Sequence, residues 1–171
     1  MALERVNGSG SYMHPSDPGE PSTGKPRLSI TDEEAAIIAD FCFGERTVME
    51  IGTGLGVSTR AIAEVAETVF TVDIDPWVQE NIWPTLPGNV YGISEVYTHG
   101  RVIDVAFIDG DHSTEATARD IVAVLPILRP VTGVILLHDT NYPNVRAACT
   151  HDGWEFIETT HGIGVHRFLP R

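Results

Sequence analysis

The feature of this sequence that most constrains its fold is a repeated alternation of short apolar runs with helical segments. The apolar runs that predict strands lie at residues 47–51, 69–74, 89–93, 102–108 and 134–137. The helical segments between them lie at 57–67, from 76 to about 83, and from Ser113 to about 128. Strands that alternate with helices predict a mostly parallel sheet with helices on both faces. Continuous apolar runs, such as Val105 to Ile108, are typical of strands buried on both sides.

A further helix precedes these elements and a hairpin follows them. Thr31 is suited to cap the helix, and Glu34, three residues later, completes a capping-box pattern. Gly44 is expected to end it. A short helix is expected after Pro143, and two late strands at 154–158 and 164–168 predict a hairpin through His161-Gly162. We therefore predict a doubly wound α/β fold with a seven-stranded sheet and a C-terminal antiparallel hairpin.

Composition limits the number of domains and the class of partner. Residues 1–27 are rich in Gly, Ser and Pro and predict an irregular arm, whereas residues 28–171 suit one domain. The chain shows no apolar run long enough for a membrane span and no signal-peptide core, and its two cysteines form no framework. We therefore expect a cytoplasmic protein. The net charge of −13, with Lys25 the single lysine, disfavours nucleic acid as a partner.

Polar residues gather where the predicted strands end, and ligands of doubly wound folds bind outside that edge of the sheet. They comprise the glycine loop Gly52-Thr53-Gly54-Leu55-Gly56, Asp73 and Asp75, Ser94, Asp109, Asp111 and His112, and His138 and Asp139. Charged residues are seldom buried without partners, so packing alone explains this distribution poorly.

The glycine loop and Asp73 together predict a nucleotide-like ligand. The third glycine, Gly56, falls one residue earlier than in a dinucleotide fingerprint, which disfavours NAD. Asp73 lies about twenty residues after the loop, where a carboxylate can accept hydrogen bonds from both ribose hydroxyls. The structural alternatives are a plain tight turn for the loop and helix capping for Asp73. Asp75, directly before Pro76, is assigned mainly to capping.

These residues carry a resemblance to a known family. Val48-Met49-Glu50-Ile51-Gly52-Thr53-Gly54-Leu55-Gly56 with Val72-Asp73 resembles motifs I and II of class I S-adenosylmethionine (SAM)-dependent methyltransferases. The more selective blocks are Phe107-Ile108-Asp109-Gly110-Asp111-His112 and Leu136-Leu137-His138-Asp139-Thr140. They resemble small-molecule O-methyltransferases, including catechol- and macrolide-sugar-modifying enzymes. The resemblance covers roughly residues 30–169 and implies a Rossmann-like fold.

The resemblance also implies roles for single residues. The cofactor SAM would be held by residues of the loop and of the neighbouring strand ends, namely Glu50, Gly52, Thr53, Gly54, Gly56, Ser58, Asp73, Ile74, Ser94 and Asp109. Within this set Ser58 matches a position that binds the carboxylate of SAM, and Asp73 would bind its ribose. Catalysis would fall to His112 as general base together with Asp109.

A divalent metal is the second implied ligand. Asp109 and Asp139 match acids that hold the ion in metal-dependent members, and with His138 they form a set suited to Mg²⁺ or Mn²⁺. The histidine leaves Fe²⁺ or Zn²⁺ open. The third ligand could equally be Thr140 or Asn141, and the site could be empty. The alternatives are a core histidine at 138 and a helix-entry residue at 112.

Other functions stay in competition with O-methylation of a small-molecule acceptor. They are an NAD- or nucleotide-binding oxidoreductase, a nucleic-acid methyltransferase, and a non-catalytic SAM-binding domain. The first is disfavoured by the glycine spacing, and the second by the acidic charge and by Asp109-Gly110-Asp111-His112 in place of an amino-methylating motif. The acceptor is not readable from the sequence. A homodimer is mildly preferred, because a chain this short leaves the acceptor pocket shallow.

Overall fold

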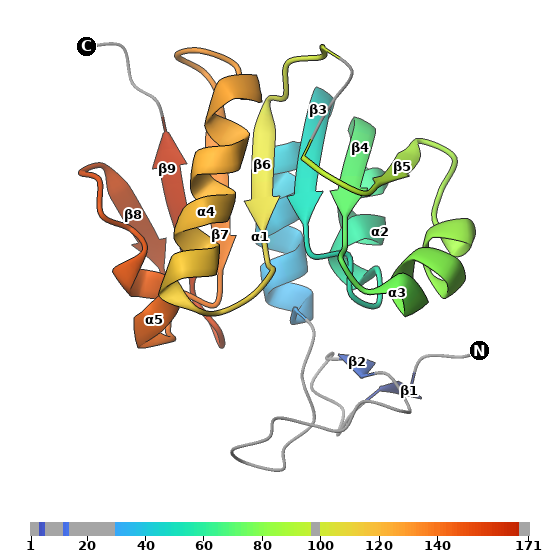
Figure 1. Ribbon diagram of the computed structural model, residues 1–171, viewed down its shortest axis with the longest axis horizontal. Helices are drawn as coiled ribbons and strands as arrows, with labels where there is room; N and C mark the ends of the chain where they lie inside the picture. The colour runs from blue at the N-terminus through green and yellow to red at the C-terminus, as the bar shows by residue number, and fades with distance from the viewer. Residues whose placement is uncertain (1–3, 6–11, 14–29, 97–99, 168–171) are drawn as a thin grey trace.

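The computed structural model describes residues 4–5, 12–13, 30–96 and 100–167 and contains a mixed seven-stranded sheet (Figure 1). Its strands are β3 (Gly44–Ile51), β4 (Ala66–Val72), β5 (Val90–Ile93), β6 (Val105–Ile108), β7 (Val134–His138), β8 (Trp154–Ile157) and β9 (Ile163–Arg167). The order across the sheet is β5-β4-β3-β6-β7-β9-β8. Strands β3 to β7 are parallel, while β9 runs antiparallel to both β7 and β8. The predicted fold and C-terminal hairpin are confirmed.

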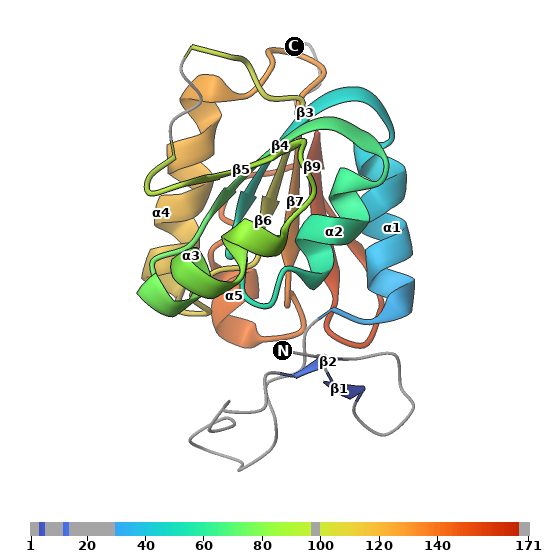
Figure 2. The same cartoon turned by 90° about the vertical axis from the view of Figure 1, so that its right-hand side faces the viewer.

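The helices cover both faces of this sheet (Figure 2). They are α1 (Asp32–Cys42), α2 (Val57–Ala63), α3 (Pro76–Asn81), α4 (Thr114–Val124) and α5 (Pro143–Ala147), with 3₁₀ turns η1 (Trp83–Thr85) and η2 (Leu125–Ile127). Helices α1 and α2 lie on one face and α4 on the other. Thr31 and Glu34 form the predicted capping box at the start of α1.

Two hydrophobic cores follow from the alternation of side chains along the central strands. Val48 and Phe107 pack in the core beneath α1 and α2, whereas their neighbours Met49 and Ile108 pack in the core beneath α4 and α5. All four side chains are at most 2% exposed. The sheet is therefore a well-packed support that brings the carboxyl ends of the five parallel strands to one edge.

Two helices end earlier than the sequence pattern predicts. Helix α2 stops at Ala63, and the region 64–67 turns into β4, because Gly44 pairs with Ala66 and the Gly44 N–H donates to the Val65 carbonyl. Strand pairing thus replaces the last helical turn. Helix α4 stops at Val124 and passes into η2, where Pro126 lacks the N–H that a continuing helix needs.

The predicted N-terminal arm, residues 1–27, lies largely outside the described residues. Within it, β1 (Glu4–Arg5) and β2 (Tyr12–Met13) pair antiparallel. Phe168, predicted to end the last strand, also lies outside them. Among the helices that the structure describes, none has the length and apolarity required to cross a membrane.

Candidate active site

The glycine loop joins β3 to α2 and lies directly against the end of β6. The Gly52 N–H donates to the Val72 carbonyl at 2.8 Å. Gly52 has φ of +96°, and a β-carbon there would lie 2.0 Å from the backbone oxygen of Asp109. Gly56, with φ of +72°, starts α2. Only glycine permits this conformation and this close approach at position 52.

Asp73 points at the glycine loop. Its Oδ2 accepts from the Gly54 N–H at 2.9 Å, and its Oδ1 accepts from the Asp75 N–H at 2.8 Å. Asp75 itself caps α3 by accepting from the Trp77 N–H, as predicted. Next to Asp73 the side chain of Ile74 is 92% exposed, an unusual state for a large apolar residue. Together with the exposed Ser94 after β5, these residues form the rim beside the loop.

Glu50 and Ser58 lie beneath the loop and not on its outer surface. Glu50 is fully buried and accepts hydrogen bonds of 2.6 Å from the hydroxyls of Ser58, Thr59 and Thr71. Burial raises the pKa of Glu50 to about 7, and the three donors oppose that rise. Because a hydroxyl has one hydrogen, the Ser58 hydroxyl donates to Glu50 and has none left for a ligand.

A second cluster forms where β6 and β7 end. The Nδ1 atom of His138 lies 3.1 Å from Asp109 Oδ1 and 3.4 Å from Asp139 Oδ2. His112 Nε2 lies 2.7 Å from Asp139 Oδ2 and 3.9 Å from Asp109 Oδ1. Asp139 has φ of +61°, a left-handed conformation that Asp tolerates better than most residues. The two strand ends thus bring together two pairs of residues, Asp109 with His112 and His138 with Asp139, that lie far apart in the sequence.

The charges of this cluster stabilise one another. The neighbouring carboxylates of Asp109 and Asp139 raise the pKa of His112 to about 10. Burial lowers the pKa of His138, but the charge of Asp109, the hydrogen bond to Asp109 and the contacts with Asp139 and Glu34 together outweigh burial and hold that pKa well above its usual range. Burial likewise raises the pKa of both aspartates, and the two histidines outweigh it. In this arrangement His112 carries a proton at neutral pH and cannot accept a second one.

Neighbouring residues complete the cluster in ways the sequence did not indicate. Tyr142 stacks on His112 with ring centroids 5.7 Å apart. The Oδ1 of Asp111 accepts from the Ser113 N–H at 2.7 Å and supports the start of α4. The amide of Asn141 donates to the Thr159 carbonyl. Tyr142 has no sequence signal, because its place depends on how α5 packs after β7.

Glu34 is a second residue whose role the sequence shows only in part. Beyond its capping-box bonds, it accepts from the Thr159 hydroxyl at 2.7 Å and the His161 N–H at 2.8 Å. Its Oε2 also lies 3.4 Å from the Nε2 of His138. Burial alone would raise the pKa of Glu34, but its contacts with His138 and His161 and its hydrogen bonds from Thr31 and Thr159 hold that pKa well below the usual range. Glu34 therefore ties α1 to the hairpin and to the back of His138.

Within the part of the chain that the structure describes, the geometry allows a cation at two places. Ligand atoms of Asp109, His138 and Asp139 lie within 4.8 Å of one another, and so do those of Glu34, His138 and His161. The first group faces the rim, and its donor set combines two carboxylates with an imidazole. In the second group, Oε2 of Glu34 already accepts hydrogen bonds from Thr31 and His161. The first group is therefore the better candidate for a metal.

Comparisons with known proteins identify the family and the fold of the chain. Residues 49–140, more than half of the chain, match the sequence model of a family described as a methyltransferase domain. No curated protein sequence matches the chain at a significant level.

Solved structures show the same fold. An O-methyltransferase from Bacillus cereus in complex with S-adenosylhomocysteine (SAH) is similar with a TM-score of 0.63 and 17% identity, over 81% of this chain and 82% of that one. The N-methyltransferase NodS from Bradyrhizobium japonicum WM9 is similar with a TM-score of 0.62 and 11% identity, over 81% of this chain and 96% of that one. A precorrin-6y C5,15-methyltransferase from Geobacter metallireducens is similar with a TM-score of 0.61 and 15% identity, over 81% of this chain and 88% of that one. At such identities the likeness concerns the fold.

Proposed function

Because the chain belongs to the methyltransferase-domain family that matches residues 49–140, we propose that it transfers the methyl group of SAM to a hydroxyl of a small-molecule acceptor. One observation carries this proposal. Gly52 of the glycine loop touches the backbone of Asp109, so the loop adjoins the cluster of Asp109, His112 and Asp139. A donor site and a proton-handling site therefore share one edge of the sheet.

The residues around the loop fit the donor. The carboxylate of Asp73 is fixed by two backbone N–H groups, and each of its oxygens keeps a lone pair for a ribose hydroxyl. The exposed side chain of Ile74 offers an apolar surface for adenine, beside Ser94. The glycine loop gives the backbone access that the amino-acid part of SAM requires. Bound SAM supplies an electrophilic methyl group on a sulfonium.

The acceptor hydroxyl would bind at Asp109, His112 and Asp139. Methyl transfer requires this oxygen to lose its proton and to line up with the methyl group. His112 can take the proton only when the carboxylates that now hold it engage another partner. Asp109, Asp139 and His138 would hold a divalent cation, with Mg²⁺ or Mn²⁺ as the expected ions, and its charge would compete with His112 for the two carboxylates. The stacked Tyr142 keeps the ring of His112 at the rim.

The test has three arms on the full chain. Calorimetry with SAM, SAH and NAD should give binding of the first two only; binding of NAD alone would support the oxidoreductase instead. Turnover should then be screened with sugar, phenol and amine acceptors, since the similar structures include an N-methyltransferase. Methylation of amines and never of hydroxyls would contradict O-methylation.

Base and metal are tested separately. Replacing His112 by Ala should reduce kcat by about 10²- to 10⁴-fold while SAH binding persists. Chelation followed by Mn²⁺ addition should abolish and restore activity, and Asp139→Asn should weaken Mn²⁺ binding. Unchanged turnover in His112→Ala would remove His112 as base, and activity that survives chelation would remove the metal. SAH binding without turnover on any acceptor would favour the non-catalytic SAM-binding domain.

A further inference from the structure

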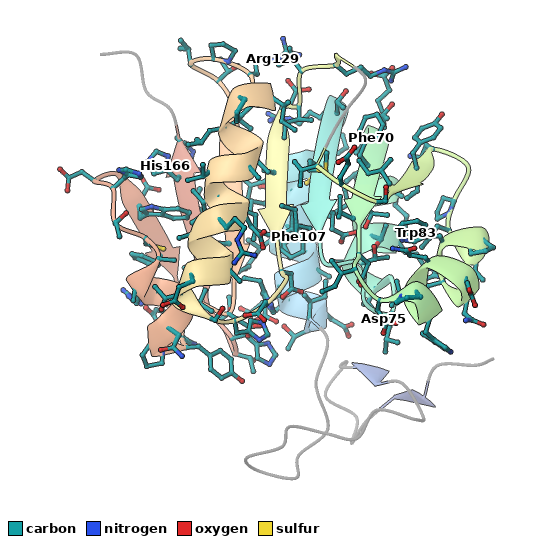
Figure 3. The ribbon with its side chains drawn as sticks, viewed as in Figure 1. Phe70, Asp75, Trp83, Phe107, Arg129 and His166 are labelled. Atoms are coloured by element: carbon teal, nitrogen blue, oxygen red, sulfur yellow. The ribbon has the colours of Figure 1, made fainter. Side chains whose placement is uncertain are left out.

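The turn η1, which follows α3, contacts the glycine loop from outside the β3–α2 unit. Trp83 lies between α3 and β5 (Figure 3), and its indole Nε1 donates to the hydroxyl of Thr53 at 3.1 Å. The indole also lies against Gly92 of β5, where a β-carbon would come within 2.3 Å of the ring. The absence of a side chain at position 92 is therefore what admits the indole.

The hydrogen bonds beyond Trp83 run in one direction. Thr71 donates its only hydroxyl hydrogen to Glu50 at 2.6 Å. The hydroxyl of Thr53 lies 2.6 Å from that of Thr71 and must therefore be the donor between them. Thr53 then has only lone pairs left, and the indole N–H fills one of them. An unbroken chain connects Trp83 through Thr53 and Thr71 to the buried Glu50.

A second tie holds the other end of the loop. The guanidinium of Arg60 donates to the carbonyls of Leu55 and Gly56, at 3.1 and 2.9 Å. The same group donates to the hydroxyl of Thr85 in η1 at 2.7 Å. Side chains on either side of η1, Ile82 and Leu86, lie near Gly56. Thus η1 contacts Thr53 of the glycine loop directly and is connected to Leu55 and Gly56 through Arg60.

We infer that Trp83 and Thr85 are positioning residues of the donor site: η1 clamps the glycine loop in the conformation that receives the amino-acid part of SAM. The inference rests on the proposed function. Without the clamp, Thr53 would lose the donor that fixes its side chain, and the backbone of the loop would sample conformations that SAM cannot use. Because SAM binding would then have to order the loop, the affinity for SAM would fall.

The experiment is a double-mutant cycle on SAH binding by calorimetry, with the melting temperature as a second readout. Trp83→Phe keeps a ring over Gly92 and removes only the N–H, while Thr53→Val keeps the shape and removes the hydroxyl. Trp154→Phe is the matched control, since Trp154 lies on β8 at the opposite edge of the sheet from β5. Thr85→Val tests the second tie.

We expect Trp83→Phe and Thr53→Val each to weaken SAH binding by about 5-fold, the equivalent of one hydrogen bond. The double variant should bind no more weakly than Thr53→Val alone, because both changes break one chain. Thr85→Val should weaken binding independently of Trp83→Phe, and Trp154→Phe should bind as the wild type does.

Other results overturn the inference. If Trp83→Phe bound SAH normally and only melted earlier, the indole would be a packing residue. If the double variant lost SAH affinity by the product of the two single losses, Trp83 and Thr53 would act independently and the chain of hydrogen bonds would be refuted. Absence of SAH binding by the wild-type chain would instead overturn the proposed function, and the role of the clamp with it.

Discussion

Replacing Glu50 by Gln should change how the stability of the protein depends on pH. The carboxyl of Glu50 has a folded-state pKa of about 7, against 4.5 in the unfolded chain. An acid whose pKa is raised on folding makes its full contribution to stability when the pH lies below its pKa in the unfolded chain. That contribution is lost as the pH rises through the pKa of the folded state. With 1.36 kcal/mol for each unit of pKa, the loss amounts to about 3 kcal/mol in total.

The assay is urea unfolding of wild type and Glu50→Gln at about pH 5.5 and at about pH 8, a range that contains about 2 kcal/mol of this loss. Glu34, Asp109 and Asp139 have lowered pKa values and stabilise the protein with the opposite pH dependence. They are present in both proteins, so they cancel in the difference.

The free energy of unfolding of Glu50→Gln should therefore rise by about 2 kcal/mol relative to wild type between the two pH values. Glu80→Gln, on the exposed end of α3, serves as the control and should track the wild type. A difference that does not change with pH would refute the claim that burial raises the pKa of Glu50 to about 7. It would mean instead that Ser58, Thr59 and Thr71 stabilise the carboxylate fully.

Two further predictions concern stability. Gly52→Ala should destabilise the fold by more than about 3 kcal/mol in chemical unfolding, because its β-carbon would collide with the Asp109 backbone, whereas Gly88→Ala, with open space, should be nearly neutral. A folded Gly52→Ala with normal SAH binding would contradict the close approach. Glu34→Ala should cost about 3 to 5 kcal/mol because buried donors lose their acceptor, against little for the exposed neighbour Glu33→Ala. Equal melting temperatures for these two variants would show that Glu34 only caps α1.

The sequence predicted the elements well where local patterns and pairing agree. The capping box at Thr31, the buried strands β6 and β7 and the late hairpin all follow from residue type and spacing. The predicted element ends were wrong by a few residues where local pattern and strand pairing conflict. At the end of α2, pairing with β3 draws the chain into β4. Hydrophobic periodicity cannot anticipate a register set by a distant strand.

The candidate site divides in the same way. Asp73 was predicted to bind ribose because a carboxylate about twenty residues after a glycine loop can accept hydrogen bonds from both ribose hydroxyls. The structure places Asp73 against the loop through its bond to the Gly54 N–H, and ribose binding stays a prediction. The positions of Glu50 and Ser58 beneath the loop could not be predicted, because their hydrogen bond depends on how β3 and α2 pack together. For the same reason Trp83 gave no signal of its contact with Thr53.

The sequence by itself determined the order of strands and helices and hence the edge where the polar residues collect, since the alternation of apolar runs and helices allows few other arrangements. The tertiary structure alone decided which of those residues meet. His112 and Asp139 lie 27 positions apart and still come within 2.7 Å, and Glu34 reaches His161 across 127 positions. Such contacts arise from strand order, from the left-handed turn at Asp139 and from burial, and these properties belong to the folded sheet.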